Sequence, residues 1–471
     1  MKKKKKHAEI GHVVLVVFLC LFAMILGTRA SRLRAWAAGE EDPIAVHAGG
    51  AAAESYLMGP AGEAEAEPIL TRTLSLKKSL MTTAVPTVWD SRNVGKTGTI
   101  RNQGDLSTCW AFASLSGVEA FLLPEEPQDF SVDHMITYCG FGDRAKSGGT
   151  FAMALAYLTA WRGPVYEKDD PYNDGQTNPM AKVRYHLQGA ELLNNDPAAV
   201  KLAVLRYGAV QSSMYADEGI LISNDTTSYY NADCFSYYYD GAEKTNHDVL
   251  IIGWDDTYSA KNFVKQPPVD GAFLCQNSWG DDFGENGYFY VSYADTRIIN
   301  FAMTYSRIDP VGVYDHIYQH DDLGWVAQMG FDEFAAWGAN VFTAERDESL
   351  RAVGLYAVQP GTRYEIYFES EPDTTDFSER QLVASGTFRN AGYYTIDLDR
   401  AIPLEEGERF GLVIKMSTTV RGNQLAAEAE ENGARAVVNS RESYISADGE
   451  HWYDAGLTLG CNLCLKGYTV E

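Results

Sequence analysis

Cysteine is scarce in this chain of 471 residues, which has seven, six of them beyond residue 37. Six cysteines over such a length are too few for a disulfide scaffold, so a hydrophobic core must hold the fold. Cys461 and Cys464 have CxxC spacing, but no second pair accompanies them, and we interpret them as structural. The nine histidines and the acidic residues show no metal-ligand spacing, so neither a metal nor another cofactor is expected.

Long hydrophobic runs are also lacking, apart from one near the N-terminus. Residues 13–27 are largely apolar and follow the basic run of residues 2–6, while Ala35-Trp36-Ala37 has the small-x-small pattern of a cleavage site. This arrangement is typical of a secretory signal and predicts a signal peptide over residues 1–37. The alternative is an uncleaved membrane anchor, although the run is shorter than the roughly 20 residues of a spanning helix. A secreted or cell-surface protein is therefore expected.

Basic residues are few: the chain has 39 basic and 64 acidic residues, which gives a net charge of −25. Without residues 1–37, 31 basic and 63 acidic residues remain, a net charge of −32. Such a surface repels nucleic acid and anionic lipid and suits a solvated protein outside the cell. No nucleic-acid partner is expected.

The chain is too long for one ordinary core, so two folded domains and a leader are predicted. Residues 38–84 are rich in small and acidic residues without a helical stripe, which indicates a propeptide or linker. The composition changes at Val85, and residues 85–306 form the predicted first domain. Residues 311–471 contain short strand-like runs at 351–358, 362–369, 393–398, 410–416, 444–445 and 463–470, with a hairpin signal at Asp448-Gly449 between the last two. They predict an antiparallel β-sandwich.

The first domain mixes helical and strand-like patterns. Apolar residues from Cys109 onward have largely helical spacing until Pro124, and Ser107 or Thr108 is placed to cap this helix. A second helix is predicted over 151–161, and strands over 248–254 and 287–293. Cys109 therefore lies in the first turn of a helix, where aligned peptide dipoles favour a thiolate.

Four polar side chains in this domain together provide the groups of one type of catalytic site: Gln103, Cys109, His247 and Asn277. They supply an amide donor, a thiol, an imidazole and a second amide, as cysteine-dependent acyl transfer requires. In this order, with Trp110 after the thiol and Ser-Trp-Gly after Asn277, the set resembles the papain-like cysteine peptidases over roughly residues 85–306. The resemblance implies an α+β fold of two subdomains, a helical half and a β-barrel-like half, followed here by the all-β sandwich.

The resemblance also implies a role for each residue. Cys109 is the nucleophile, and His247, 138 residues later, holds it as thiolate and moves protons. Asn277 orients the imidazole under the cover of Trp279, and Gln103 donates to the oxyanion of the tetrahedral intermediate.

A glycine pair before the second predicted helix matches the segment that lines the substrate cleft in this family. By that match, Gly148 and Gly149 bind the substrate main chain and Phe151 shapes the specificity pocket. The resemblance also implies that Trp279 takes part in substrate binding. The tyrosines at 229–230 and 237–239 precede His247, and we interpret them as a packed loop rather than a cleft border.

Several positions depart from the family pattern. The cysteine that usually precedes the nucleophile is absent, as is its partner near Lys146, so Cys139 is unpaired unless Cys234 reaches it. The interval from His247 to Asn277 is 30 residues, long for the family, with a hairpin insertion predicted over 256–270. Asp248 replaces a small residue, and its charge is expected either to raise the imidazole pKa, which would shift the pH range of activity, or to favour a basic group on the leaving side of the substrate.

The predicted function is that of an exported cysteine endopeptidase, monomeric, that hydrolyses protein or peptide substrates through a Cys-His thiolate pair and an acyl-enzyme. The C-terminal region resembles the lectin-like sandwich behind papain-like domains of some bacterial exported proteins, which implies a carbohydrate or cell-surface ligand. Two alternatives remain open: a Cys-His amidase of the cell wall, and a catalytically silent surface adhesin that binds through residues 311–471.

Overall fold

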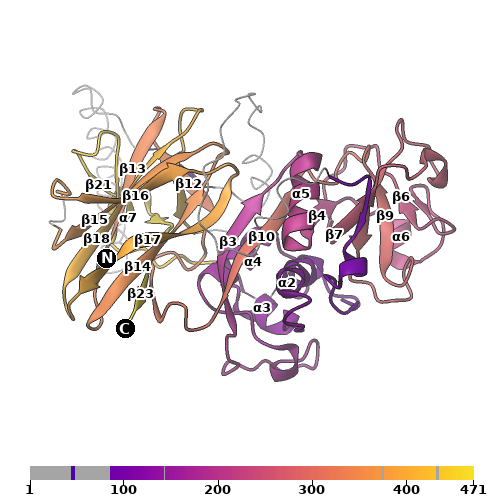
Figure 1. The fold of residues 1–471 in the computed structure, drawn as a ribbon, viewed down its shortest axis with the longest axis horizontal. Coiled ribbons are helices and arrows are strands. Elements are labelled where there is room, and N and C mark those ends of the chain that lie inside the picture. The colour runs from indigo at the N-terminus through magenta and orange to yellow at the C-terminus, as the bar shows by residue number, and fades with distance from the viewer. Residues whose placement is uncertain (1–43, 48–84, 143, 373–375, 431–433) are drawn as a thin grey trace, which may run out of the picture.

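The computed structural model describes residues 44–47, 85–142, 144–372, 376–430 and 434–471, which form two lobes side by side (Figure 1). The predicted signal peptide and most of the predicted propeptide or linker lie outside the described residues. No helix in the described ranges has both the length and the apolar character needed to cross a membrane. We refer to residues 85–310 as the N-terminal lobe and to residues 311–471 as the C-terminal lobe.

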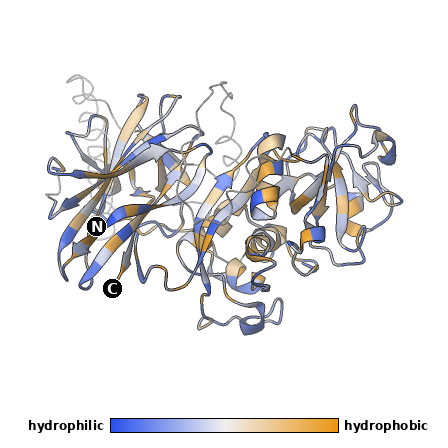
Figure 2. Ribbon diagram, in the orientation of Figure 1, coloured by the Kyte–Doolittle hydropathy of each residue, from blue (hydrophilic) through white to orange (hydrophobic). Residues whose placement is uncertain are grey.

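The helical half of the N-terminal lobe contains α2 (Cys109–Leu122), α3 (Val132–Tyr138) and α4 (Phe151–Thr159). The predicted helix from Cys109 is confirmed. The second predicted helix ends at Thr159 rather than 161, because Trp161 has a φ of 58°, in the left-handed region. Apolar side chains of these helices form a shared core. Figure 2 colours the ribbon by hydropathy, with hydrophobic residues in orange.

The other half of the N-terminal lobe is built on an antiparallel run of strands, which includes the predicted strands at 248–254 and 287–293. In sheet order its strands are β3 (Tyr185–Leu192), β10 (Ala302–Pro310), β4 (Val210–Met214), β7 (His247–Asp255), β8 (Ala272–Gln276), β9 (Tyr288–Ser292), β6 (Ser236–Tyr237) and β5 (Tyr230–Asn231). β2 (Val88–Asp90) also pairs with β7, and β6 lies parallel to β9. The helices α5 (Pro197–Tyr207) and α6 (Glu218–Ile222) complete this half.

Short turns of 3-10 helix occur at η2 (Ser91–Val94), η3 (Glu167–Asp169) and η4 (Ala260–Asn262). The last lies in the segment 256–271, which connects the antiparallel neighbours β7 and β8. An insertion was predicted here from the long interval between His247 and Asn277, but the predicted hairpin is wrong, since no strand forms within residues 256–271.

The C-terminal lobe is a β-sandwich, as predicted. One six-stranded sheet has the order β16 (Gln381–Thr387), β15 (Arg363–Ser370), β18 (Arg409–Ser417), β13 (Ala335–Thr343), β20 (Ser443–Ser446) and β21 (Tyr453–Asp454). A four-stranded sheet has the order β1 (Ile44–His47), β12 (Ala327–Gly330), β19 (Leu425–Glu428) and β22 (Asn462–Leu463). The strand β1 lies inside the segment predicted as propeptide or linker and pairs antiparallel with β12.

One detail of the predicted sandwich is wrong. Asp448-Gly449 joins β20 to the short strand β21, and not to the run at 463–470. A short helix, α7 (Ala455–Leu459), follows β21, and the run itself is divided into β22 and β23 (Leu465–Val470). Asp448-Gly449 does form the turn of a hairpin. Its second strand, β21, has only two residues and is too short to be recognised from a hydrophobic pattern.

A single sheet crosses from one lobe to the other. The strands β11 (His316–Tyr318), β23, β14 (Glu348–Ala357) and β17 (Gly392–Leu404) continue the sheet of the N-terminal lobe, since β17 pairs with β3. The core of the helical half includes Tyr356 and Tyr393 from these strands. The two lobes therefore share backbone hydrogen bonds and a hydrophobic core.

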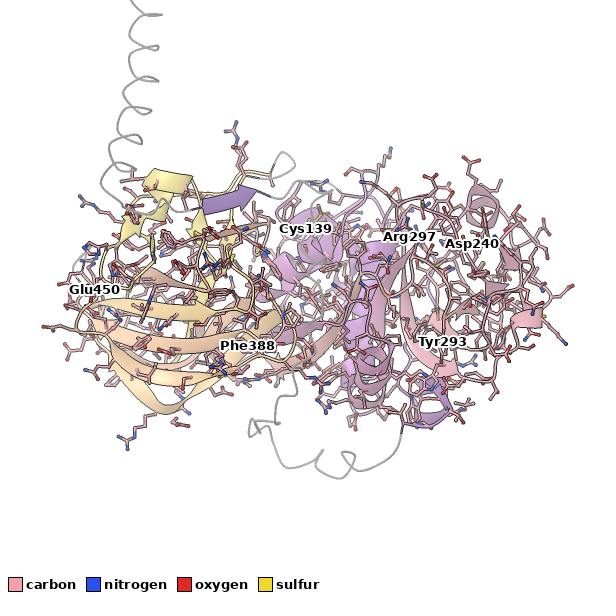
Figure 3. The ribbon with its side chains drawn as sticks, turned by 90° about the horizontal axis from the view of Figure 1, so that it is seen from above. Cys139, Asp240, Tyr293, Arg297, Phe388 and Glu450 are labelled. Atoms are coloured by element: carbon pink, nitrogen blue, oxygen red, sulfur yellow. The ribbon has the colours of Figure 1, made fainter. Side chains whose placement is uncertain are left out.

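Aromatic side chains reinforce this junction. The Trp161 indole stacks on His186 at 3.7 Å and on Tyr468 at 5.3 Å between ring centroids. The hydroxyls of Thr159 and Tyr356 lie 3.1 Å apart. Figure 3 shows the junction from above, with Phe388 and Glu450 in one lobe and Asp240 and Tyr293 in the other.

We predict that Gly392→Ala destabilises both lobes together. A Cβ at Gly392 would lie 2.1 Å from the carbonyl oxygen of Ala190 in β3, so the strands that join the lobes would have to separate. We expect a loss of about 1–3 kcal/mol in a single unfolding transition, measured by calorimetry. Gly407→Ala is the matched control, because Gly407 also has a positive φ but no atom within 4 Å of the added Cβ. Two separate transitions would contradict the shared core.

Candidate active site

Cys109 is the first residue of α2, and its thiol lies at the N-terminal end of a helix buried on almost every side. Thr108 is the N-cap residue, but its side chain does not cap the helix, so this part of the prediction is wrong. Its hydroxyl lies 2.7 Å from that of Tyr172 instead. Backbone N–H groups of Cys109, Trp110 and Asp248 lower the pKa of the thiol. They are donors positioned to stabilise a thiolate.

The electrostatic environment of Cys109 contains opposing influences. Burial raises the pKa of the thiol to about 12, and the nearby carboxylate of Asp248 also raises it. The three backbone N–H groups act in the opposite direction. Among these influences on the pKa of the thiol, desolvation is the largest.

His247 begins β7 and is held by Asn277. Its Nε2 lies 2.8 Å from Oδ1 of Asn277, and the Trp279 ring stacks on the imidazole with 4.5 Å between centroids. Oδ1 of Asn277 also accepts from the backbone N–H of Ser278 at 2.8 Å, which fixes the amide orientation. With Nε2 donating to Asn277, Nδ1 is the ring nitrogen left for proton transfer. Burial lowers the pKa of His247 to about 4, and the bond to Asn277 opposes this shift.

Gln103 is attached to the segment that follows Asn277. Its Oε1 accepts from the hydroxyl of Ser278 at 2.7 Å, and its backbone N–H donates to the Ser278 carbonyl at 2.8 Å. The Nε2 group donates to the Leu106 carbonyl at 2.7 Å. A bridge between Asn102 and Trp279 extends this pairing. The residues around Gln103 and Asn277, far apart in the chain, therefore form one small unit.

The predicted substrate-binding residues lie beside the start of α2. The backbone N–H of Ser107 donates to the Ala145 carbonyl at 2.8 Å, which anchors the loop that carries the glycine pair. Gly148 has a φ of 73°, and a Cβ at Gly149 would lie 2.5 Å from the Trp110 ring. Phe151 begins α4 and is partly buried. This loop can approach Cys109 only because Gly149 has no side chain.

Two polar contacts of this region were not recognised from the sequence. Tyr172 donates from its hydroxyl to the Gln103 carbonyl at 2.9 Å and so connects Gln103 with Thr108. Ser278 was quoted only as part of a motif, although its hydroxyl orients Gln103. Tyr172 stands in a loop without a motif, so no sequence signal marks it.

The remaining predictions concern cysteines and tyrosines. All cysteines in the described part of the chain are free, so Cys139 does not pair with Cys234. Tyr230, Tyr237 and Tyr239 are buried in the core of the strand-rich half, as predicted for a packed loop.

Comparison with known proteins agrees with this geometry. Residues 85–306 match the papain family of cysteine proteases, and residues 317–469 match a lectin-like domain. The chain carries a papain-family cysteine protease domain followed by a lectin-like domain. Both predicted family resemblances are thereby confirmed, as is the predicted fold class.

Similar proteins include solved structures with both domains. The cysteine protease and lectin-like domains of Cwp84, a surface layer associated protein of Clostridium difficile, are 28% identical with a TM-score of 0.72, over 82% of this chain and 89% of that one. A structure of Cwp84 after propeptide cleavage is 27% identical with a TM-score of 0.71, over 81% of this chain and 99% of that one. Cathepsin J of Mus musculus is 28% identical over 219 residues, 44% of this chain. The chain spans 60% of the length of this curated relative.

We predict that Trp279→Ala raises the pKa of His247 in the papain-family domain. The indole keeps water from the imidazole, and burial is the main reason that its pKa lies near 4 rather than 6.5. NMR titration of histidine-labelled protein, in a Cys109→Ala background, should show a rise of about one unit or more. Trp452→Ala, in the lectin-like domain, is the control. An unchanged pKa in the Trp279 variant would show that the indole does not desolvate the imidazole.

Proposed function

We propose that this protein is an exported cysteine endopeptidase in which Cys109, His247, Asn277 and Gln103 are catalytic. The observation that supports it best is the hydrogen bond from His247 to Asn277 under the Trp279 ring. It fixes the imidazole at the start of β7, the strand that packs against the helix α2 that Cys109 begins. A thiol and an oriented imidazole on facing elements are the requirement for nucleophilic attack on a peptide carbonyl.

Attack begins with transfer of the thiol proton to Nδ1 of His247. Sγ then forms a bond to the substrate carbonyl carbon, and the carbonyl oxygen becomes an oxyanion. In this proposal, Nε2 of Gln103 and the backbone N–H of Cys109 donate to that oxyanion. The His247 imidazolium protonates the leaving amine, and the C–N bond breaks to give a thioester acyl-enzyme.

Deacylation reverses these proton movements. A water molecule gives a proton to Nδ1 of His247 and attacks the thioester carbonyl. The C–S bond then breaks, the carboxylic acid leaves, and the thiol regains its proton. Asn277 keeps the imidazole in one tautomer through both half-reactions, because its Oδ1 accepts the hydrogen of Nε2.

The lectin-like domain is proposed to bind a carbohydrate or another cell-surface ligand, and the protein is proposed to act as a secreted or surface-bound monomer. The predicted signal peptide, the acidic surface and the similarity to a surface layer associated protein support this location. Because β17 and β3 join the two domains in one sheet, a ligand held by the lectin-like domain would fix the orientation of the peptidase domain.

We predict that Cys109→Ala abolishes both covalent labelling by a peptidyl epoxide and hydrolysis of a mixed peptide pool. Intact mass spectrometry and peptide sequencing would measure the two effects on residues 82–471. Cys139→Ala is the matched control, since Cys139 is also free but fully buried. Cuts within peptides, rather than at their ends, would support endopeptidase action.

The same experiment separates the two alternatives. Release of soluble wall fragments without peptide cleavage would favour the cell-wall amidase. A folded wild type that is neither labelled nor active, yet binds cell surfaces, would favour the silent adhesin.

We predict that Gln103→Ala lowers kcat by about a hundredfold, with a much smaller effect on KM. The reason is that the amide would donate to charge that develops only during the reaction. Steady-state hydrolysis of a peptide found in the pool measures both constants. Gln381→Ala replaces an exposed glutamine of β16 and serves as the control. A change confined to KM would assign Gln103 to substrate binding.

A further inference from the structure

Asp248 has an unusual position for a carboxylate. It follows His247 on β7 and lies at the interface with the helix that begins at Cys109. Its Oδ1 accepts from the Ser213 hydroxyl at 2.6 Å, and its Oδ2 accepts from Nε2 of Gln211 at 2.9 Å. Both donors are neutral and come from β4, the strand beside β7. The carboxylate charge is therefore hydrogen-bonded but not neutralised by these partners.

Gln211 connects this carboxylate with α2. Its Nε2 also donates to the Trp110 carbonyl at 3.3 Å, and its Oε1 accepts from the Ser114 hydroxyl at 2.9 Å. The Tyr305 hydroxyl from β10 donates to the same Oε1 at 3.3 Å. One buried amide thus ties Asp248 to the first two turns of the helix that carries the thiol. Such a network fixes the helix against the strand that carries His247.

No cation compensates Asp248 within the described residues. Of the groups on the packed elements, Arg101 pairs with Glu119 of α2 at 3.0 Å, and Tyr305 and the β4 side chains are neutral. The imidazole of His247 and the thiol of Cys109 are the remaining titratable groups. The Asp248 charge consequently acts on the thiol, and it raises the pKa of Cys109.

We propose that Asp248 is a positioning and charge-tuning residue, whose carboxylate holds α2 against β7 through Gln211 and places a negative charge close to the Cys109 thiol. This inference rests on the proposed function of the pair but concerns the proton equilibrium alone. A negative charge close to the thiol opposes loss of its proton. The residue thereby sets the pH above which the thiol becomes reactive.

The test is the pH dependence of Cys109 alkylation by iodoacetamide in full-length protein. In Asp248→Asn we expect the midpoint of reactivity to fall by about one pH unit relative to wild type. Asp248→Glu, which keeps the charge, should retain the wild-type midpoint. Ser213→Ala removes a neutral donor and leaves the carboxylate, so its midpoint should not fall. If Asp248→Asn fails to fold, Asp248→Ser provides a second neutral residue that can accept a hydrogen bond.

Alkylation needs no peptide hydrolysis, so its result is independent of the proposed enzymatic activity. A lower midpoint in the neutral variants of a protein that cleaves no peptide would support the role of Asp248 and reject the proposed function. An unchanged midpoint in a folded neutral variant would overturn the inference, even if kcat fell. Equal midpoints for Asp248→Asn and Asp248→Glu, both shifted, would also overturn it, since packing and not charge would then be responsible.

Discussion

The burial of α2 on nearly all sides is the constraint on which the active-site geometry depends. Residues 110–120 of this helix are all buried, and they contact α3, α4 and the strands β4, β7 and β10. A helix packed this way cannot rotate or slide without opening cavities in several layers at once. The position of the Cys109 thiol is therefore set by the packing of a whole domain.

Hydrogen bonds to a polar side chain of this helix also help to fix its position. Glu119, fully buried, accepts from Arg101 and from the backbone N–H of Phe130. Arg101 in turn stands two residues before Gln103, and its carbonyl accepts from the N–H of Gly280 at 3.0 Å. Loss of these donors would leave the buried Glu119 carboxylate without partners and would destabilise the folded protein. The end of α2 and the segment containing Gln103 therefore hold each other in place.

Much of this arrangement could be predicted because the segments of the candidate active site carry dense local signals. Cys109 begins an apolar helical pattern, and His247 and Asn277 adjoin apolar strands. The lobe junction could not be predicted, since β17 pairs with β3 through only three residue pairs between strands 200 residues apart. Tyr172 and Gln211 were missed for a related reason: single buried polar residues acquire their partners only when distant elements meet.

The shared sheet restricts the motion of the two domains relative to each other. In most chains, domains joined by a linker move independently, because their interface is small and polar. Here the strand pairing and the stacking of Trp161 between His186 and Tyr468 remove that freedom. A surface bound by the lectin-like domain would face the peptidase domain at a fixed angle. Substrate choice would then depend on which segments of a neighbouring protein reach Cys109 at that angle, in addition to the side chains that the cleft accepts.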